Sequence, residues 1–281
     1  MKTYYDFQLI LYGGVIIGAL MKNFNNYIEI MNNHDIYSDE IINIDSCDFL
    51  TPTLLLPLLT FSYNYNKKIK KHTNPKINDY LYKILGIKKH TNTTVPFRWV
   101  DETQDNSAEL TREIINIMRP ENNMNQPLRY IFHEVLANVY DHSKFDKGFV
   151  IAQHYPKIKS ADYAFMDNGV SIPGSFSNSN FSFKNDCDAI IQAINGKSTR
   201  DSDEYVRAGT GLNSIVNLVV DGNKGSFLIA SRRGVLEFGK NGIISNEIPE
   251  NYIKGTLINF RLKSNNFIDF YENIKGKIYT L

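Results

Sequence analysis

The sequence has few cysteines and no large excess of positive or negative charge, and each of these features excludes a class of protein. The only cysteines, Cys47 and Cys187, lie far apart with no metal-ligand spacing around either. This excludes a disulfide scaffold and a cysteine-based zinc site, and it fits a reducing cytoplasm. Thirty-one basic residues against thirty acidic ones leave a formal charge of +1. Such a balance gives no global field that attracts nucleic acid or an anionic membrane, so nucleic acid is not indicated as a partner.

Long apolar runs are missing as well. The most membrane-like stretch, LILYGGVIIGALM at residues 9–21, is shorter than the roughly 20 residues that a spanning helix needs. It has no small-residue cleavage site, and Asp6 stands where a signal peptide would be basic. We therefore expect a soluble cytoplasmic protein with no membrane partner, in which this stretch is a buried element.

The 281 residues, 42% apolar and 22% charged, are typical of a globular protein with one large domain or two small ones. Residues 1–95 are expected to form a small α/β domain. In it, the short buried strand IINI is followed by a turn and by the apolar helix TLLLPLLTF, within residues 41–61. A polar, turn-rich stretch at residues 88–107 predicts a domain boundary near residue 95.

The second expected domain, residues 96–281, begins with two helices. Strand-like segments follow at 148–155 and 162–169, then two short helices, a hairpin turning at Arg233–Gly234, and a last strand GTLINFRL. Helices followed by consecutive strands predict an α+β two-layer sandwich with the helices on one face of a mainly antiparallel sheet.

The helix containing HEVLANVYDHS, residues 133–143, carries a carboxylate and a carboxamide on an otherwise apolar segment. Glu134 and Asn138 are four residues apart, so they project from one face of the helix. Burying them without partners costs several kcal/mol in rough terms, so either the core or a ligand must satisfy them. A zinc helix is excluded because Ala137 stands where the second histidine would be.

Three glycine-containing motifs follow along the chain: DNGVSIPG at 167–174, GTGL at 209–212 and GT at 255–256. Each alone is a weak signal, because glycine turns are mostly just turns. The segment NGKSTR at 195–200 contains the Gly-Lys-Ser of a P-loop. However, Ile191 replaces the required first glycine and a helix precedes the segment, so we reject a P-loop there.

In this order, the motifs resemble those of the GHKL ATPase superfamily, which includes gyrase, histidine kinases and anti-sigma-factor serine kinases. EVLAN is similar to the N box, DNG to the G1 box, GTGL to the G2 box and GT to the G3 box, over about residues 105–262. The ending NVYDHS is most similar to the anti-sigma kinase branch. Ser171 departs from the pattern, because the G1 box usually has a second glycine there.

The resemblance implies a Bergerat-type fold that binds Mg·ATP. Glu134 would be the general base, Asn138 a Mg²⁺ ligand through its carboxamide oxygen, and Asp167 the acceptor of the adenine amino group. The residues expected at the nucleotide are Asn138, Asp167, Gly169, Lys197, Arg200, Gly209, Thr210, Gly211, Leu212 and Thr256. Lys197, Arg200 and Arg207 would belong to a lid, or would simply be solvated. His142 would either serve the site or cap its helix.

The first domain resembles STAS domains in its strand–turn–helix segment IINIDSCDFLTPTLLLPLL. Thr53 stands near the position of their phosphorylatable serine, and the alternative is an ordinary helix-start threonine. The expected function is a regulatory ATPase or a protein serine/threonine kinase, with ATP/ADP and either a protein partner or a second copy as its partners. The alternative is a nucleotide-gated interaction switch with little turnover, controlling a toxin, a defence effector or a transcription regulator. A histidine kinase is disfavoured, since the helix before the N box has no histidine.

Overall fold

The central element of the fold is a seven-stranded antiparallel sheet. The computed structural model describes residues 18–35, 38–100, 107–118, 124–142, 147–199, 211–264 and 267–281. In spatial order the strands of the sheet are β3 Thr94–Val100, β4 Gly148–Tyr155, β5 Ser160–Asp167, β9 Thr256–Lys263, β6 Ser226–Ser231, β7 Gly234–Gly239 and β8 Gly242–Glu247. Every neighbouring pair in this sheet is antiparallel. The predicted mainly antiparallel α+β class is thus confirmed, and the predicted hairpin turns at Arg232–Arg233, one residue early.

One face of the sheet is covered by helices of the C-terminal part. They are α4 Ser107–Asn116, α5 Asn125–His142, α6 Ile172–Asn178, α7 Asp186–Ile194 and α8 Gly211–Asn217. A π-helical turn extends α8 to Gly222, and the short helix α9 Phe270–Asn273 lies on the outer side of this helix layer. Strand side chains alternate between faces, so Tyr163, Phe165 and Phe260 point to this side. They pack around Phe132 of α5, with ring centroids 5.1 to 6.0 Å apart.

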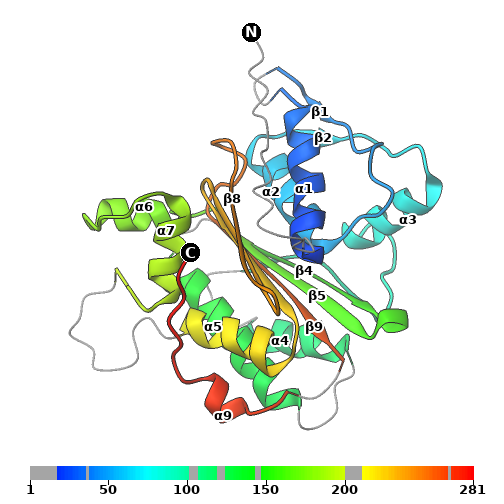
Figure 1. Ribbon diagram of the computed structural model, residues 1–281. Helices are drawn as coiled ribbons and strands as arrows, with labels where there is room; N and C mark the ends of the chain where they lie inside the picture. Colours follow the sequence, from blue (N-terminus) through cyan, green and yellow to red (C-terminus); the bar gives the residue numbers. More distant parts are fainter. Residues whose placement is uncertain are drawn as a thin grey trace.

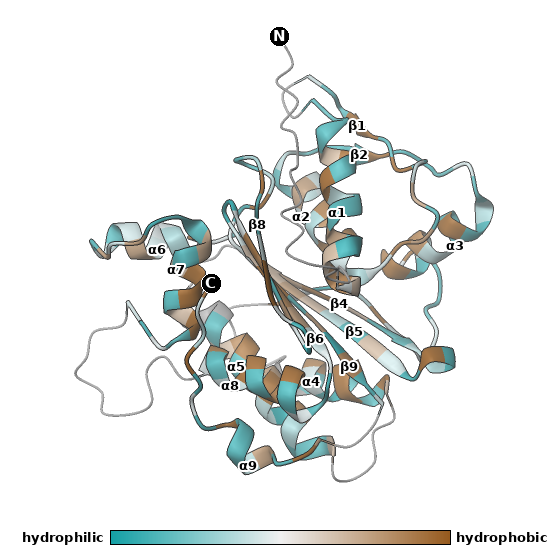
Figure 2. Ribbon diagram, viewed as in Figure 1, coloured by the Kyte–Doolittle hydropathy of each residue, from teal (hydrophilic) through white to brown (hydrophobic). Residues whose placement is uncertain are grey.

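The opposite face of the sheet is covered by α1 Ala19–Asn32, α2 Pro52–Asn64 and α3 Pro75–Ile84 (Figure 1). The apolar residues of α1 and α2 share one core with the alternate residues of the sheet, among them Met166 and Leu228. Figure 2 shows brown positions on the helices of both faces and along the central strands. The sheet is therefore covered on both faces, where the sequence predicts helices on one.

The N-terminal region contributes little sheet of its own among the described residues: β1 Ile41–Ile42 and β2 Lys68–Ile69 form a two-residue parallel pair. Residue 95, the predicted domain boundary, is the second residue of β3 and pairs with Ala152 of β4. Residues 9–17 of the early apolar stretch lie outside the described ranges. Across those ranges, no helix is both long and apolar enough to cross a bilayer.

Helix α1 is attached to the sheet by a buried carboxylate. Its N-cap residue, Gly18, offers no side-chain cap, and Glu237 of β7 instead accepts a hydrogen bond from the Met21 backbone N–H at 2.7 Å. A Cβ at Gly18 would overlap that carboxylate, so the carboxylate could keep its present position only beside a glycine. Burial raises the pKa of Glu237, and the backbone N–H groups of Met21 and Leu20 oppose that rise. Glu237 therefore acts as a cap supplied from another element.

Replacing Glu237 with alanine is expected to lower the free energy of unfolding by about 1–3 kcal/mol, because the first-turn N–H groups of α1 would be buried without an acceptor. Chemical denaturation measures this loss. Glu250→Ala, which removes an exposed carboxylate from the same part of the chain, is the control and should change stability by less than about 0.5 kcal/mol. Equal effects of the two variants would contradict the capping role.

Candidate functional site

Asp167 ends β5 with a buried carboxylate. It is 4% exposed and, by the alternation of β5, it projects toward the face that carries α5 and α8. Its Oδ1 accepts a hydrogen bond from the Gly169 N–H at 2.8 Å. Burial raises the pKa of Asp167 to about 7, and the backbone N–H groups of Gly169 and Thr256 limit the rise. An ionised carboxylate can accept more hydrogen bonds than these two backbone groups supply.

The start of β9 packs directly on Asp167. Gly255 has φ +87°, and a Cβ there would overlap the carbonyl oxygen of Asp167 and lie 2.6 Å from its Oδ1. Only glycine permits this approach. The next residue, Thr256, projects to the same face as Asp167 and has its Oγ1 2.9 Å from the Oγ of Ser231. The predicted G1-like and G3-like motifs are thus in contact.

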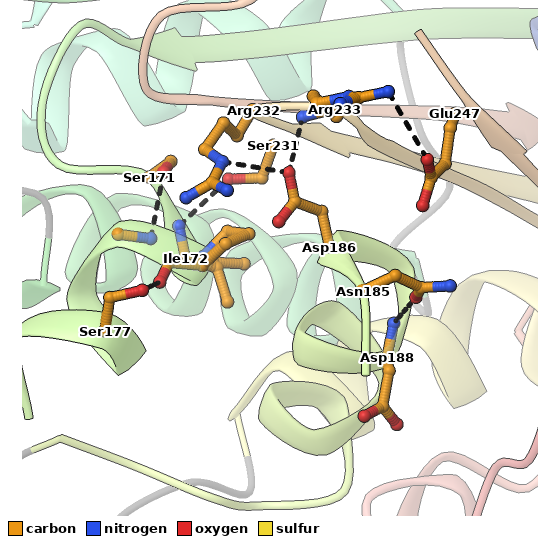
Figure 3. A network of polar contacts seen from close by, with 12 residues as sticks. Ser171, Ile172, Ser177, Asn185, Asp186, Asp188, Ser231, Arg232, Arg233 and Glu247 are labelled. Carbon is orange, nitrogen blue, oxygen red and sulfur yellow. Dashed lines mark hydrogen bonds and ion pairs between the residues drawn. The ribbon is translucent and has the colours of Figure 1, made fainter. Parts of the chain in front are cut away.

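Ser231, the last residue of β6, joins this cluster although the sequence gives no sign of it. Its hydroxyl accepts a hydrogen bond from the Ile172 N–H at 2.9 Å (Figure 3). The same hydroxyl donates to the Gly255 carbonyl at 3.2 Å. Only the pairing of β6 with β9, which sets Ser231 opposite Thr256, reveals the role. Ser231 therefore connects the start of α6 to the Asp167 region.

Ser171 replaces the second glycine of the motif without strain. It is the N-cap of α6 with φ −55°, and its Oγ accepts a hydrogen bond from the Gly174 N–H at 3.1 Å. This backbone conformation suits any L-residue, so the turn does not require glycine here. The departure from the family pattern leaves the neighbourhood of Asp167 intact.

The β6–β7 turn is fixed beside this cluster by Asp186, the first residue of α7. Its buried carboxylate accepts hydrogen bonds from the Arg232 Nε and the Arg233 N–H, each at 3.0 Å (Figure 3). Gly234 lets the turn approach, since a Cβ there would lie 2.7 Å from the carbonyl carbon of Asp186. These contacts hold the end of β6, and with it Ser231, in place.

Glu134 and Asn138 lie one turn apart on α5, and both are partly buried. Glu134 lies against the start of α8, because a Cβ at Gly211 would overlap its Oε2. The Nδ2 of Asn138 is buried without a hydrogen-bond partner among the described residues. The N-box-like helix and the end of the G2-like motif are therefore in contact. No described residue supplies an acceptor for this Nδ2.

Other predicted residues have different surroundings. Leu212 is 9% exposed and belongs to the core under α8. The Lys197 Nζ donates a hydrogen bond to Gln192 Oε1 at 2.7 Å and lies 4.5 Å from the centroid of the Phe181 ring. Thr53 is fully buried, and the helix cap is Thr51, whose Oγ1 accepts from Leu54 N–H. Arg200, Arg207, Gly209, Thr210 and the side chain of His142 lie outside the described part of the chain.

The candidate site thus consists of two contacts between the motifs, Asp167 with Gly255 and Glu134 with Gly211, on one face of the sheet. Carboxylates and a carboxamide around two close-approach glycines can hold a ligand that supplies N–H donors and a cation. No protein-family model matches this sequence, and no curated protein is significantly similar to it.

Proposed function

We propose that the cluster formed by α5, α8 and the ends of β5 and β9 binds Mg·ATP, in a regulatory ATPase or protein serine/threonine kinase of the GHKL type. The observation that carries this proposal is the Asp167 carboxylate, which is buried at a strand end, lies against the backbone N–H groups of Gly169 and Thr256 and packs on Gly255. No basic side chain among the described residues contributes to its pKa. A neutral ligand N–H donor, such as the adenine amino group, would complete its hydrogen bonding.

Two residues of α5 fit the rest of such a ligand. The Asn138 Nδ2 is a buried donor with no hydrogen-bond partner among the described residues, and the oxygen of the same carboxamide is a ligand type that suits Mg²⁺. Bound Mg²⁺ would supply the positive charge that offsets the charge of the phosphates. Glu134, one turn from Asn138, would accept the proton of an attacking water or hydroxyl. Gly211 allows the chain to pass close to the Glu134 carboxylate.

The burial of Thr53 bears on where a phosphoryl group would go. A fully buried side chain in the second position of α2 is not accessible to a kinase site in the folded protein. The acceptor of a transferred phosphoryl group would therefore be a hydroxyl other than that of Thr53. The alternative, a nucleotide-gated switch with little turnover, would use the same site for binding alone.

Adenine preference is the direct test of the Asp167 role. We expect ATP to bind the wild-type protein at least 10-fold more tightly than GTP, and Asp167→Asn to weaken ATP by about 1.5–3 kcal/mol, the range for a hydrogen bond to a charged group. Isothermal titration calorimetry measures both. Asp188→Asn, which changes a half-buried carboxylate in the first turn of α7, is the control. Equal affinity for the two nucleotides would defeat the assignment.

The raised pKa of Asp167 predicts a proton linkage to binding. The free carboxyl, with a pKa of about 7, is largely protonated at pH 6, and a nucleotide that donates to the carboxylate must displace that proton. ATP affinity should therefore rise by up to 10-fold per pH unit below pH 7 and level off above it. Calorimetry at pH 6.5 in two buffers of different ionisation enthalpy should show proton release. Asp167→Asn should abolish this release, and its persistence in the variant would assign the proton to another group.

A further inference from the structure

A second concave site lies at the far end of the sheet from Asp167. It has a volume of about 370 Å³, and the described residues that line it are Ile158, Lys159, Ser160, Lys224, Gly225, Ser226, Arg261, Lys263 and Ser264. Four of these are basic and none is acidic. Ser160 starts the strand that Asp167 ends, and seven steps along a strand span about 23 Å. The pocket is therefore separate from the proposed nucleotide site.

The sheet itself brings the charges together. Ser160 pairs with Lys263 across β5 and β9, and Ser226 pairs with Arg261 across β6 and β9. By strand alternation these four side chains project to the face that carries α1 and α2. No ion pair forms on the ammonium groups of Lys159, Lys224 or Lys263 within the described ranges, whereas the whole chain carries a formal charge of only +1. The positive charge of this pocket is thus local.

Two of the lysines occupy costly backbone positions. Lys159 has φ +48° and Lys224 has φ +59°, a left-handed conformation that glycine or asparagine adopts at lower cost. Conformation therefore does not explain a lysine at either position.

Arg261 is held in position for a ligand. Asp162 accepts hydrogen bonds from its Nε at 2.6 Å and its Nη2 at 2.7 Å, and this carboxylate is fully buried while the guanidinium keeps 22% of its side-chain surface exposed. Arg261 also lies over the Tyr155 ring, 5.8 Å from the centroid. A guanidinium fixed on one edge presents its other edge in a defined orientation, which suits an oxyanion.

Ser160 adds an independent sign of a missing ligand. The residue lines the pocket and is only 4% exposed, yet its hydroxyl has no hydrogen-bond partner among the described residues. Buried hydroxyls are nearly always paired, and an unpaired one requires an explanation. An oxygen-rich anion seated among the lysines would accept its hydrogen bond.

We propose that this pocket binds a small molecule with two or more phosphate groups. Three unpaired ammonium groups, one fixed guanidinium and a buried hydroxyl match the charge and the acceptor oxygens of a diphosphate. The site is a pocket among strand ends rather than an extended basic strip, which favours a small ligand over a nucleic acid. The proposal does not depend on nucleotide binding at Asp167.

The test uses the full chain and inorganic pyrophosphate in Mg²⁺-free buffer, measured by calorimetry, with amide NMR shifts to locate the ligand. We expect saturable binding that shifts the Gly225 amide and not that of Gly169. Lys263→Glu and Lys224→Glu should each weaken binding at least 10-fold. Lys157→Glu, an equal charge change on an exposed residue that does not line the pocket, should weaken it less than 2-fold.

Ser160→Ala separates binding from folding. It should weaken pyrophosphate at least 3-fold without lowering the melting temperature, because the hydroxyl has no hydrogen-bond partner among the described residues. Asp167→Asn should leave pyrophosphate affinity unchanged, so failure of one site is distinguishable from failure of the other. No saturable binding, or equal losses in Lys157→Glu and Lys263→Glu, would overturn the proposal. Tighter binding of a short DNA duplex or of phosphatidylserine-containing vesicles, lost in Lys263→Glu, would overturn the small-molecule assignment.

Discussion

Glu134→Gln is expected to lower turnover of ATP by roughly 10²-fold or more while leaving ATP affinity within about 2-fold of wild type. Glutamine keeps the shape of the side chain beside Gly211 but cannot take a proton from an attacking oxygen. A general base acts on that oxygen in the transition state and contributes little to ground-state binding. The measurement follows labelled γ-phosphate into free phosphate and into protein, alongside nucleotide binding by calorimetry.

Asn138→Ala is the companion variant, and it should behave oppositely. Losing the carboxamide removes the proposed Mg²⁺ ligand, so the Mg²⁺-dependent part of ATP affinity should fall. If the wild-type protein binds ATP tightly and shows neither phosphate release nor phosphoryl transfer, the enzyme proposal is wrong and the interaction switch stands. Label on a partner protein, with little free phosphate, would identify a kinase.

Gly255→Ala should lower the free energy of unfolding by about 3 kcal/mol or more. A methyl group there meets the backbone carbonyl oxygen of Asp167, which cannot turn aside as a flexible side chain can. The positive φ of +87° adds a conformational cost of about 1 kcal/mol. Any folded fraction should also bind ATP poorly, because the Asp167 carboxylate would be displaced.

The matched control is Gly86→Ala. Gly86 has φ +70° but nothing lies within 4 Å of its Cβ position, so the change isolates the conformational cost, about 1 kcal/mol. Chemical denaturation of both variants gives the difference, which reports the contact with Asp167. If the two substitutions cost the same, β9 does not pack on Asp167 as described.

The sequence predicts the elements around Asp167 well because their signals are local. A continuous apolar run that ends in Asp-Asn-Gly indicates both the strand and its turn, and Gly-Thr before LINFRL indicates the start of β9. Ser231 could not be found this way, since its role depends on the register between β6 and β9. No local pattern specifies which polar residue lies opposite another across two distant strands.

The covering of both sheet faces shows a different limit. Every residue of α2 from Pro52 to Phe61 is buried, and a helix that is apolar all round must be enclosed rather than lie at a surface. The apolar sequence of α2 therefore predicts that the helix is buried, but it does not predict which element covers it. All eight residues of β5 are buried as well, which fits a strand covered on both faces.

The sequence of strand β3 is typical of a turn-rich boundary rather than of a strand, and the reason is physical. Pro96 and Arg98 interrupt the alternation, and the register shifts between Val95 and Arg98. A strand at the edge of a sheet tolerates a proline and a bulge, because one of its sides forms no ladder. Trp99 remains 46% exposed, as an edge position allows. Edge strands thus carry the weakest sequence signal.

The position of β9 has a consequence for how the chain is made. This strand lies between β5 and β6, so the consecutive strands β3 to β5 and β6 to β8 form two separate meanders until β9 joins them. During synthesis, the inner edges of β5 and β6 therefore stay unpaired until about residue 263 has left the ribosome. We expect the sheet to close only after translation is nearly complete, and a chain arrested before residue 256 to be captured by chaperones that bind exposed strands.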